Sequence, residues 1–449
     1  MNDTIAAIAT PLGIGSIAII RVSGTDSIKI VNKIFKGKNL DEVPTHTIHY
    51  GHIIEMTNII DEVLVSVFKS PKTFTREDVV EINTHGGIAT TNKILELLLR
   101  NGCRLAEPGE FTKRAYINGR IDLIEAESVM DIINAKSEKA RKLAMNGLDG
   151  KLSLLIKSLR QDIIEILANI EVNIDYPEYE DILELTINDL KPKIDNIEEK
   201  IKDLLKNSET GHIIKEGIKV SILGKPNVGK SSLLNAILDE EKAIVTDIEG
   251  TTRDYVEGSI YLNGIPLNFI DTAGIRETSD IVEKIGVDKS LKMIEESDLI
   301  LFVLNNNEKI SEEEKELLDK IKDKKHIVIV NKNDLEKKID LDDSINPIYI
   351  SAHNKEDIDI IMNKIKELFE LEKLETSDLT YISNARCISI LKEALDRVED
   401  VRKGINEEMP IDMVEIDIKE IWNSLGKIIG ETYEDELINQ LFSQFCLGQ

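Results

Sequence analysis

A glycine-rich stretch near the middle of the chain limits the possible folds more than any other feature. Its sequence, Gly224-Lys-Pro-Asn-Val-Gly229-Lys230-Ser231, has the pattern GxxxxGK[ST]. It follows a β-type run, Val220–Leu223, and opens a helix-type run, Ser232–Leu238. Glycines in such a loop let backbone N–H groups point inward, and the helix N-terminus adds positive potential. The stretch therefore predicts a phosphate-binding loop, in which Lys230 reaches the β- and γ-phosphates and Ser231 binds Mg²⁺.

Three shorter motifs follow, each directly after a strand-like run: Asp271-Thr272-Ala273-Gly274, Asn331-Lys332-Asn333-Asp334 and Ser351-Ala352-His353. Asp271 is expected in the outer shell of Mg²⁺, and the Gly274 N–H beside the γ-phosphate. The Asp334 carboxylate can accept two hydrogen bonds from guanine that adenine does not offer, so a wrong base leaves a buried charge unpaired. The Ala352 N–H is expected to donate to the guanine oxygen. Four motifs in this order predict a GTP site.

Two features of the motifs depart from small signalling GTPases. Ile275 occupies the place of their catalytic glutamine, so another group must orient the attacking water. The phosphate loop carries Asn227, and the segment from Ile244 to Asp254 adds clustered oxygens, which can hold a monovalent cation in the electrostatic role of an arginine finger. The predicted GTP-binding residues are Asn227, Val228, Gly229, Lys230, Ser231, Ser232, Thr246, Asp247, Ile248, Glu249, Gly250, Thr251, Thr252, Asp271, Thr272, Ala273, Gly274, Asn331, Lys332, Asp334, Ser351 and Ala352.

The regions around these motifs differ in periodicity. Residues 1–118 are mixed α/β, with strand-like runs at Ile5–Ala9, Ser16–Val22, Val63–Phe68 and Asp78–Asn83 and a helix at Ile88–Arg100. Apolar residues recur at helical spacing from 121 to 207, and helix returns at Arg386–Lys403, Met413–Ile429 and Tyr433–Phe442. Between these helical regions the predicted strands are Lys219–Leu223, Ser259–Leu262, Pro266–Ile270, Leu299–Leu304, Ile327–Val330 and Ile348–Ile350.

Strands that alternate with helices indicate a doubly wound, mainly parallel sheet. The fold class we predict is therefore a multidomain protein, α/β plus all-α. An N-terminal α/β domain covers 1–118, and a helical domain is split into parts at 119–214 and 379–449. A Ras-like P-loop GTPase domain at 215–378 is inserted between those parts.

Composition restricts the function classes. The 449 residues carry a net charge of −27, which argues against a general nucleic-acid binder because phosphates must be neutralised by clustered Lys and Arg. No apolar run reaches the ~18 residues that span a bilayer, and the three cysteines fit a reducing cytoplasm. One basic stretch remains, and it is either a solvated helix face or a local RNA contact; it contains Lys136, Lys139, Arg141, Lys142, Lys151, Lys157 and Arg160.

Longer strings extend a family resemblance over essentially the whole chain. In the central and C-terminal parts they are GKPNVGKSSLLN, AIVTDIEGTTRDY, DTAGIRETSDIVEKIG and LFSQFCLGQ. In the N-terminal part they are ATPLGIGSIAIIRVSG, FTREDVVEINTHGG and EPGEFTKRAYINGRIDLIEAE. On these strings the chain resembles the bacterial tRNA-modification GTPases of the MnmE (TrmE) family.

The resemblance implies how GTP is hydrolysed. It implies a K⁺-stimulated GTP hydrolase in which Glu283 orients the attacking water, together with Lys230 and Asn227 as catalytic residues. The residues implied for K⁺ are Asn227, Thr246, Ile248 through its main chain, and Thr251. Those implied for Mg²⁺ are Ser231 and Thr252.

The resemblance also implies a one-carbon site in the N-terminal domain, which dimerises in this family. A tetrahydrofolate derivative, 5-formyl- or methylene-tetrahydrofolate, is expected at Arg21, Glu81, Arg120 and the C-terminal residue. Arg21 and Arg120 can bind carboxylates, and Glu81 can pair with pterin N–H groups. This chain ends in Gln449, where a terminal lysine is usual in the family, and Cys446 stands where the family has a functionally important cysteine.

The resemblance finally implies a partner and a reaction. The homodimer would join an FAD-containing partner, MnmG (GidA), in a heterotetramer. Together they would form an aminomethyl-type group, including carboxymethylaminomethyl, at C5 of the wobble uridine of certain tRNAs in the cytoplasm. Two alternatives stay open: a ribosome-assembly GTPase, and a one-carbon folate enzyme with an accessory GTPase.

Overall fold

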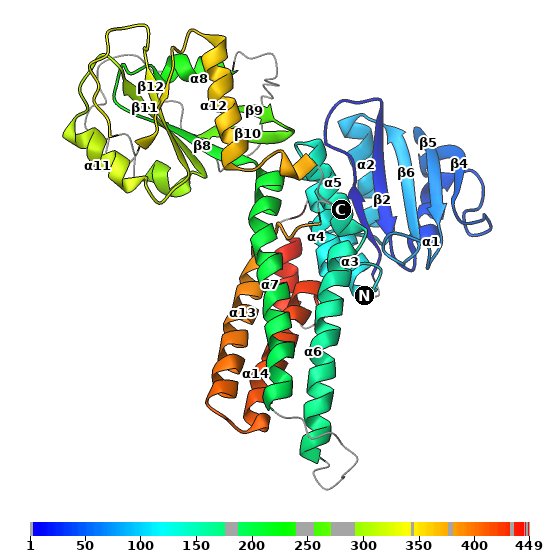
Figure 1. The fold of residues 1–449 in the computed structure, drawn as a ribbon. Helices are drawn as coiled ribbons and strands as arrows, with labels where there is room; N and C mark the ends of the chain where they lie inside the picture. The colour runs from blue at the N-terminus through cyan, green and yellow to red at the C-terminus, as the bar shows by residue number, and fades with distance from the viewer. Residues whose placement is uncertain are drawn as a thin grey trace. The chain divides into compact units, whose positions relative to one another are not determined.

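A computed structural model describes residues 3–175, 187–238, 256–270, 292–342, 345–375, 380–431, 435–443, 445 and 448. Internal contacts divide the chain into two compact units (Figure 1). The first contains Met1–Ile133, Gly147–Ile201 and Ser389–Gln449, and the second contains Asn134–Asn146 and Lys202–Ile388. The second unit is thus flanked in sequence by segments of the first, which agrees in outline with the predicted insertion.

The N-terminal part of the first unit is built on a seven-stranded sheet, counted over the described residues, with strand order β3-β4-β5-β6-β2-β1-β7. Helices α1 (Ser27–Ile34) and α2 (Ile88–Arg100) bury their apolar faces against it. The four predicted strands and the predicted helix are confirmed. The strands are β1 (Ile5–Ile8), β2 (Ile17–Ser23), β3 (Phe35–Lys36), β4 (Thr47–Glu55), β5 (Asn58–Phe68), β6 (Val79–His85) and β7 (Arg104–Leu105).

Long helices form the rest of the first unit. Buried residues of α6 (Lys151–Asp175), such as Ile156, Leu159 and Ile163, recur every three or four positions and face α14 (Ile411–Ile429). An ion pair of 2.6 Å between Arg402 and Asp195 joins α13 (Ala385–Asn406) to α7 (Ile187–Glu216). The remaining helices of this unit are α3 (Glu110–Ile117), α4 (Leu123–Asn134) and α15 (Asp435–Phe442), whereas most of α5 (Glu138–Leu148) belongs to the second unit. The helical regions predicted on both sides of the central domain are confirmed.

The second unit contains a six-stranded sheet, again counted over the described residues, with strand order β13-β12-β11-β8-β10-β9. Strand β9 runs antiparallel to β10 and the other pairings are parallel. The strands are β8 (Ile218–Leu223), β9 (Val256–Leu262), β10 (Ile265–Ile270), β11 (Leu299–Asn305), β12 (His326–Asn331) and β13 (Ile348–Tyr349). All six predicted strands are confirmed.

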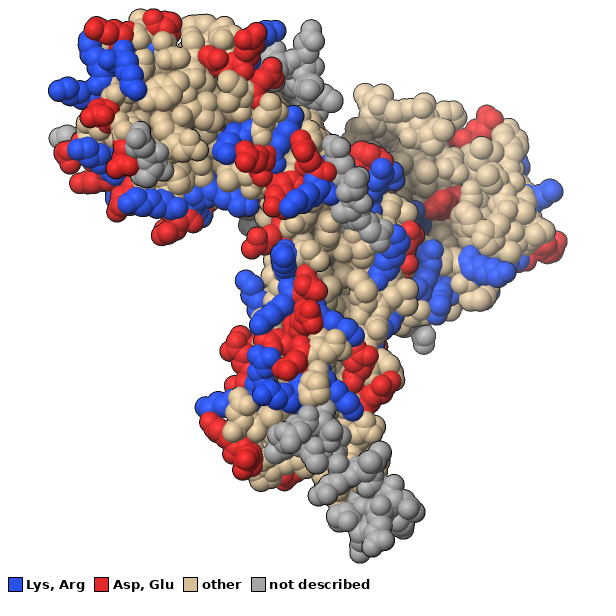
Figure 2. Space-filling model, in the orientation of Figure 1, with Lys and Arg blue, Asp and Glu red and all other residues tan. Residues whose placement is uncertain are grey.

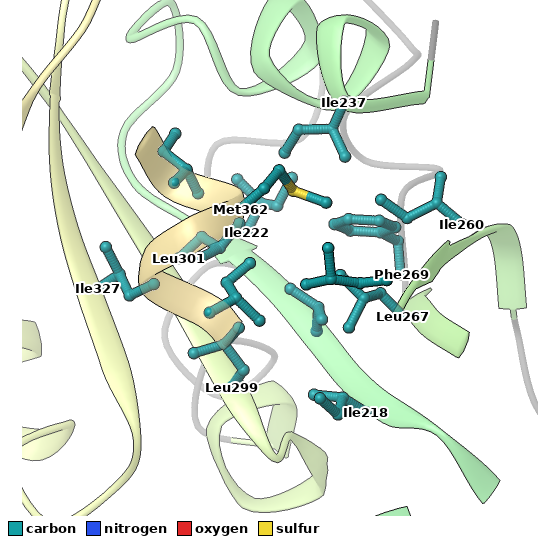
Figure 3. Close-up of a cluster of buried hydrophobic side chains, with 14 of the residues drawn as sticks. Ile218, Ile222, Ile237, Ile260, Leu267, Phe269, Leu299, Leu301, Ile327 and Met362 are labelled. Atoms are coloured by element: carbon teal, nitrogen blue, oxygen red, sulfur yellow. The ribbon is translucent and has the colours of Figure 1, made fainter. Parts of the chain in front are cut away.

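Helices cover both faces of this sheet. Alternate residues of β11 point to opposite sides, as the two-residue period of a strand requires. Leu299, Leu301 and Val303 join a core with α8 (Lys230–Leu238) and α12 (Lys355–Leu368), and Figure 3 shows part of this core. Ile300, Phe302 and Leu304 join a second core with α11 (Glu312–Lys320). The predicted doubly wound sheet is therefore confirmed.

A buried ion network fixes the start of the chain to the N-terminal domain. The Arg114 side chain is 1% exposed and donates to the Asp3 carboxylate at 2.8 Å, to both Glu77 oxygens at 3.1 Å and to Glu110 at 3.0 Å. Burial opposes ionisation of Glu110, but hydrogen bonds from Arg104, from the backbone and from Arg114 outweigh it and hold the pKa of Glu110 below its usual value. The pKa of Asp3 is lowered in the same way against the effect of burial, by hydrogen bonds from Arg104 and by the charge of Arg114.

We predict that Arg114→Met exposes this domain to local opening. It leaves the buried Glu110 carboxylate with Arg104 as its one remaining arginine partner and removes the guanidinium that Glu77 and Asp3 share, which costs ~3 kcal/mol and should raise amide hydrogen-exchange rates in β1 and α3 by about 100-fold. The folded-state pKa values of Asp3 and Glu110 are lowered. Their contribution to the free energy of unfolding is therefore present at neutral pH and is lost as the pH falls below the usual carboxyl range. Arg397→Met, which removes an exposed pair with Asp400, is the matched control and should change exchange little. Equal exchange in both variants would contradict the structural role of Arg114.

Candidate functional site

The phosphate-binding loop connects β8 to α8 and needs its glycines for close backbone packing. Gly224 and Gly229 have φ angles of 148° and 101°. A Cβ atom at Gly224 would lie 2.3 Å from the Val303 carbonyl oxygen, and one at Gly229 would lie 2.1 Å from the Asn331 side-chain nitrogen. Asn227 also has a positive φ, of 64°. No larger side chain fits at either glycine without moving the loop.

Lys230 folds back into this loop. Its Nζ donates to the carbonyl oxygens of Gly224 and Lys225 at 2.7 and 2.6 Å. Burial lowers the pKa of Lys230, because removing the ammonium from water disfavours its charged form. An ammonium held by backbone carbonyls can exchange them for phosphate oxygens, which neutralise its charge. Ser231 and Ser232 follow in the first turn of α8, where a helix N-terminus favours negative charge.

Asn331 joins three of the four predicted motifs. It stands at the end of β12 and is 3% exposed. Its Nδ2 donates to the carbonyl oxygen of Val228 in the phosphate loop at 2.9 Å. Its Oδ1 accepts from the N–H of Lys332 at 2.8 Å and from the N–H of Ala352 at 3.1 Å. One carboxamide therefore fixes the phosphate loop, the loop after β12 and the loop after β13 relative to one another.

Lys332 adds a second link between two of these loops. Its backbone has a φ of 63°, and its Nζ donates to the Asn227 carbonyl oxygen at 2.8 Å. Asp334 is exposed on the same loop, and the Ser351 N–H is held by Asp357 at 2.7 Å. The predicted contact of the Ala352 N–H with guanine stays a prediction, because in this structure that N–H donates to Asn331.

Several predicted site residues lie outside the described part of the chain, so their geometry is not tested. For the nucleotide site these are Thr246, Asp247, Ile248, Glu249, Gly250, Thr251, Thr252, Asp271, Thr272, Ala273, Gly274 and Glu283, and for the one-carbon site Gln449 and Cys446.

Asn306, at the end of β11, supports the base-reading loop and is not predicted from the sequence. It is 1% exposed, and its N–H donates to the Asn331 carbonyl at 2.9 Å while its Nδ2 donates to the Leu335 carbonyl at 3.0 Å. Its own carbonyl accepts from the N–H groups of Lys338 and Ile339 at 2.8 and 3.1 Å. Asn306 therefore holds both ends of the segment that carries Asp334. The sequence signal was an asparagine just after an apolar strand-like run, and it does not by itself reveal the hydrogen bonds.

The N-terminal domain contains a separate pocket of about 410 Å³ that Arg21, Glu81 and Arg120 line together. Arg21 and Glu81 are cross-strand neighbours on β2 and β6, and the Arg21 Nε donates to Glu81 at 2.9 Å. Arg21 also donates to the carbonyl of Gly448 at 3.3 Å, which places Gly448 beside the pocket. The structure thus brings together the three described residues that the resemblance implies.

Aromatic and basic side chains complete this pocket. The Arg120 guanidinium lies 4.9 Å from the centre of the Phe74 ring and donates to the Phe74 carbonyl at 3.1 Å. Lys72 and Arg76 also line the pocket. Two kinds of charge next to an aromatic ring suit a ligand that has a heteroaromatic ring and carboxylates. Phe74 and Arg76 lie in the string FTREDVVEINTHGG, but neither they nor Lys72 are predicted from the sequence as pocket residues; all three lie in the connection between β5 and β6.

The phosphate loop, the base loop and the doubly wound sheet define a P-loop GTPase domain. Two family models match the chain: the MnmE helical domain over residues 123–446 and the GTP-binding protein TrmE N-terminus over residues 4–120. The chain belongs to the MnmE (TrmE) family of tRNA modification GTPases.

Full-length relatives agree with this assignment. A tRNA modification GTPase MnmE of Streptococcus thermophilus (strain CNRZ 1066) is 54% identical and is covered over 98% of its length, with all of this chain aligned. The protein of the same name from Ligilactobacillus salivarius (strain UCC118) is also 54% identical, with 100% of this chain and 98% of the relative covered. Among solved structures, the G domain of the T. maritima FeoB iron transporter is 33% identical over 34% of this chain and 98% of its own, with a TM-score of 0.25.

We predict that Asn306→Leu weakens guanine recognition selectively. The substitution keeps the approximate shape but removes the hydrogen bond to Leu335, so Asp334 loses its fixed position and GDP affinity should fall about 10-fold. Inosine diphosphate lacks the amino group that Asp334 is expected to bind, so its affinity should change less. Titration calorimetry with both nucleotides measures the ratio, and Asn363→Leu on the exposed side of α12 is the control. An equal loss for both nucleotides would assign Asn306 a merely structural role.

Proposed function

We propose that this chain is a GTP hydrolase that takes part in modification of the wobble uridine of tRNA; its relatives are named tRNA modification GTPases. It would work with an FAD-containing partner, MnmG (GidA), to form an aminomethyl-type group at C5. The observation that carries the proposal is the Asn331 carboxamide, which joins a phosphate loop to a base loop. That arrangement is what a site for a purine nucleotide with a polyphosphate requires.

The roles proposed for side chains in hydrolysis are those that the family resemblance implies. Lys230 would exchange its two backbone acceptors for β- and γ-phosphate oxygens. Ser231, together with Thr252, would bind Mg²⁺, which supplies charge neutralisation between the phosphates. Asn227, on the surface of the loop, would bind K⁺ together with Thr246, Ile248 and Thr251. Glu283 would orient the attacking water in place of the missing glutamine.

The N-terminal pocket is proposed to bind a one-carbon tetrahydrofolate derivative. Arg21 and Arg120 supply guanidinium groups for carboxylates, and Glu81 supplies an acceptor for pterin N–H groups. Gly448 contacts Arg21, so the adjoining Gln449 would contribute its terminal carboxylate, and Cys446 lies in the same C-terminal segment. The bound derivative would supply the carbon that becomes the new substituent of the uridine.

We predict that Arg120→Met weakens binding of 5-formyltetrahydrofolate by about 10- to 100-fold, which is the range for one charge-assisted hydrogen bond. Arg120 is exposed apart from its contacts with Phe74, so the variant should fold normally. Fluorescence titration of the full chain measures the affinity. Arg100→Met, on an exposed face of α2 away from the pocket, is the matched control. Wild-type affinity in the Arg120 variant would remove this residue from the proposed site.

A homodimer through the N-terminal domain is also proposed. The face of its sheet that α1 and α2 do not cover carries the exposed apolar side chains of Ile17, Ile48, Tyr50 and Leu64. Tyr50 and Leu64 are direct partners across β4 and β5, so part of the patch is continuous. A second copy of the chain would remove this apolar surface from water.

The distribution of charge supports a tRNA-binding surface to which both this chain and its partner contribute. On the face in Figure 2, Lys and Arg side chains are interspersed with Asp and Glu. With a net charge of −27, the chain would leave much of the phosphate contact to its partner. No helix among the described residues is long and apolar enough to cross a membrane. We propose a cytoplasmic location on the basis of the substrate.

Nucleoside mass spectrometry separates this proposal from the two alternatives. We predict that tRNA from a strain lacking the gene loses the C5-modified wobble uridine, and that the wild-type gene restores it while Lys230→Ala does not, because the phosphates lose their lysine. A ribosome-assembly GTPase would instead leave the uridine unchanged and alter ribosomal subunit profiles. If the chain were a folate enzyme with an accessory GTPase, the Lys230→Ala gene would fully restore the modified uridine in the deletion strain.

A further inference from the structure

A second pocket, of about 440 Å³, adjoins the proposed folate pocket in the first compact unit. Phe74 and Arg120 line both pockets and are joined by a hydrogen bond of 3.1 Å. The two residues therefore form a shared wall, the Phe74–Arg120 partition, between the two pockets. The remaining lining residues are Ile121, Glu125, Val129, Ile132, Ile133 and Leu148. Neither GTP hydrolysis nor folate binding gives this pocket a role.

The walls of the second pocket are mainly apolar. Val129, Ile132 and Ile133 lie at helical spacing on α4, and Leu148 ends α5. Phe74 adds an aromatic ring from the partition. These surfaces fit the faces of a flat ring, and the volume lies in the usual range for sites that hold small ligands, about 300–1,000 Å³.

Glu125 is the single carboxyl group in the lining. It forms a reciprocal cap with Asp122: one Glu125 oxygen accepts from the Asp122 N–H at 2.7 Å, and the Glu125 N–H donates to the Asp122 side chain at 3.1 Å. This cap fixes the side chain and leaves accepting capacity on the carboxyl group. Burial raises the pKa of Glu125, so a ligand N–H that bonds to the carboxylate would lessen the cost of burying its charge.

We infer that this pocket receives a pyrimidine base of the RNA substrate, turned out of its stack and held beside the one-carbon donor. The inference rests on the proposed function, because it needs the folate derivative on the other side of the Phe74–Arg120 partition. The uracil of a uridine has two apolar faces for Phe74 and the α4 side chains and a ring N–H, at N3, for Glu125. Enzymes that act on a base in RNA or DNA take it out of the stack in this way.

A pterin fits this pocket less well than the first. Its edge carries several donors and acceptors, and the second pocket offers one carboxyl group and one guanidinium. The first pocket offers Arg21, Glu81 and Arg76 in addition to Arg120. The two pockets therefore differ in chemistry as the two reactants do, and their shared wall brings the reactants together.

Filling the pocket tests the inference. Val129→Trp should abolish wobble-uridine modification by the complete chain with its FAD-containing partner, a loss of about 100-fold, while 5-formyltetrahydrofolate binding and GTP turnover stay at wild-type values. Leu154→Trp, at a side chain 66% exposed on α6, is the control and should modify tRNA normally. Normal modification by Val129→Trp would overturn the inference, and so would loss of folate binding, which would make the pocket part of the folate site. A wild-type protein that modifies no tRNA would instead contradict the proposed function itself.

Photo-crosslinking provides a direct readout that does not depend on the reaction. A tRNA with 4-thiouridine at the wobble position should crosslink to the α4 peptide containing Val129 in the wild type and in Leu154→Trp, and not in Val129→Trp. Crosslinks confined to other segments, or unchanged in Val129→Trp, would place the base elsewhere and overturn the inference.

Discussion

The Asn331 carboxamide is the interaction on which the nucleotide site depends. Its Nδ2 donates to the phosphate loop, and its Oδ1 accepts from the loops after β12 and β13. The positions of three segments far apart in sequence are therefore fixed relative to one another. The parallel pairing of β8, β11 and β12 brings the ends of these strands to one edge of the sheet. Asn306 extends the arrangement by holding the loop that carries Asp334 at both of its ends. Phosphate binding and base reading are therefore parts of one hydrogen-bonded assembly.

The first compact unit uses charge in a different way. Arg114 is buried and saturated by carboxylates, so its charge stabilises the junction of the chain start with α3. Arg21 and Arg120 are partly exposed at pockets, and each retains donors that can turn to a ligand. Three arginines in one domain thus have different consequences because their burial and partners differ. The contact of Arg21 with Gly448 further links the end of the chain to the N-terminal pocket.

The nucleotide loop and the doubly wound sheet could be predicted because local sequence determines them: glycines at Gly224 and Gly229, and apolar strands followed by polar motifs. The N-terminal pocket could not be derived in this way, since the Arg21–Glu81 pair results from the register of β2 with β6. Strand β4 is not predicted because its nine residues include two histidines and a glycine, which weaken its strand pattern. Asn306 belongs to no motif, and its role follows only from its hydrogen bonds to residues far along the chain.

Family membership and geometry lead to the same central claim, that the second unit holds a guanine nucleotide through its phosphates and its base at once. Titration calorimetry of the purified chain with GDP and with ADP, in the presence of Mg²⁺, tests that claim most directly. We expect saturable GDP binding and an ADP affinity weaker by about 10⁴-fold, since adenine leaves the base loop without its partners. Equal affinities, or no binding of GDP, would contradict it.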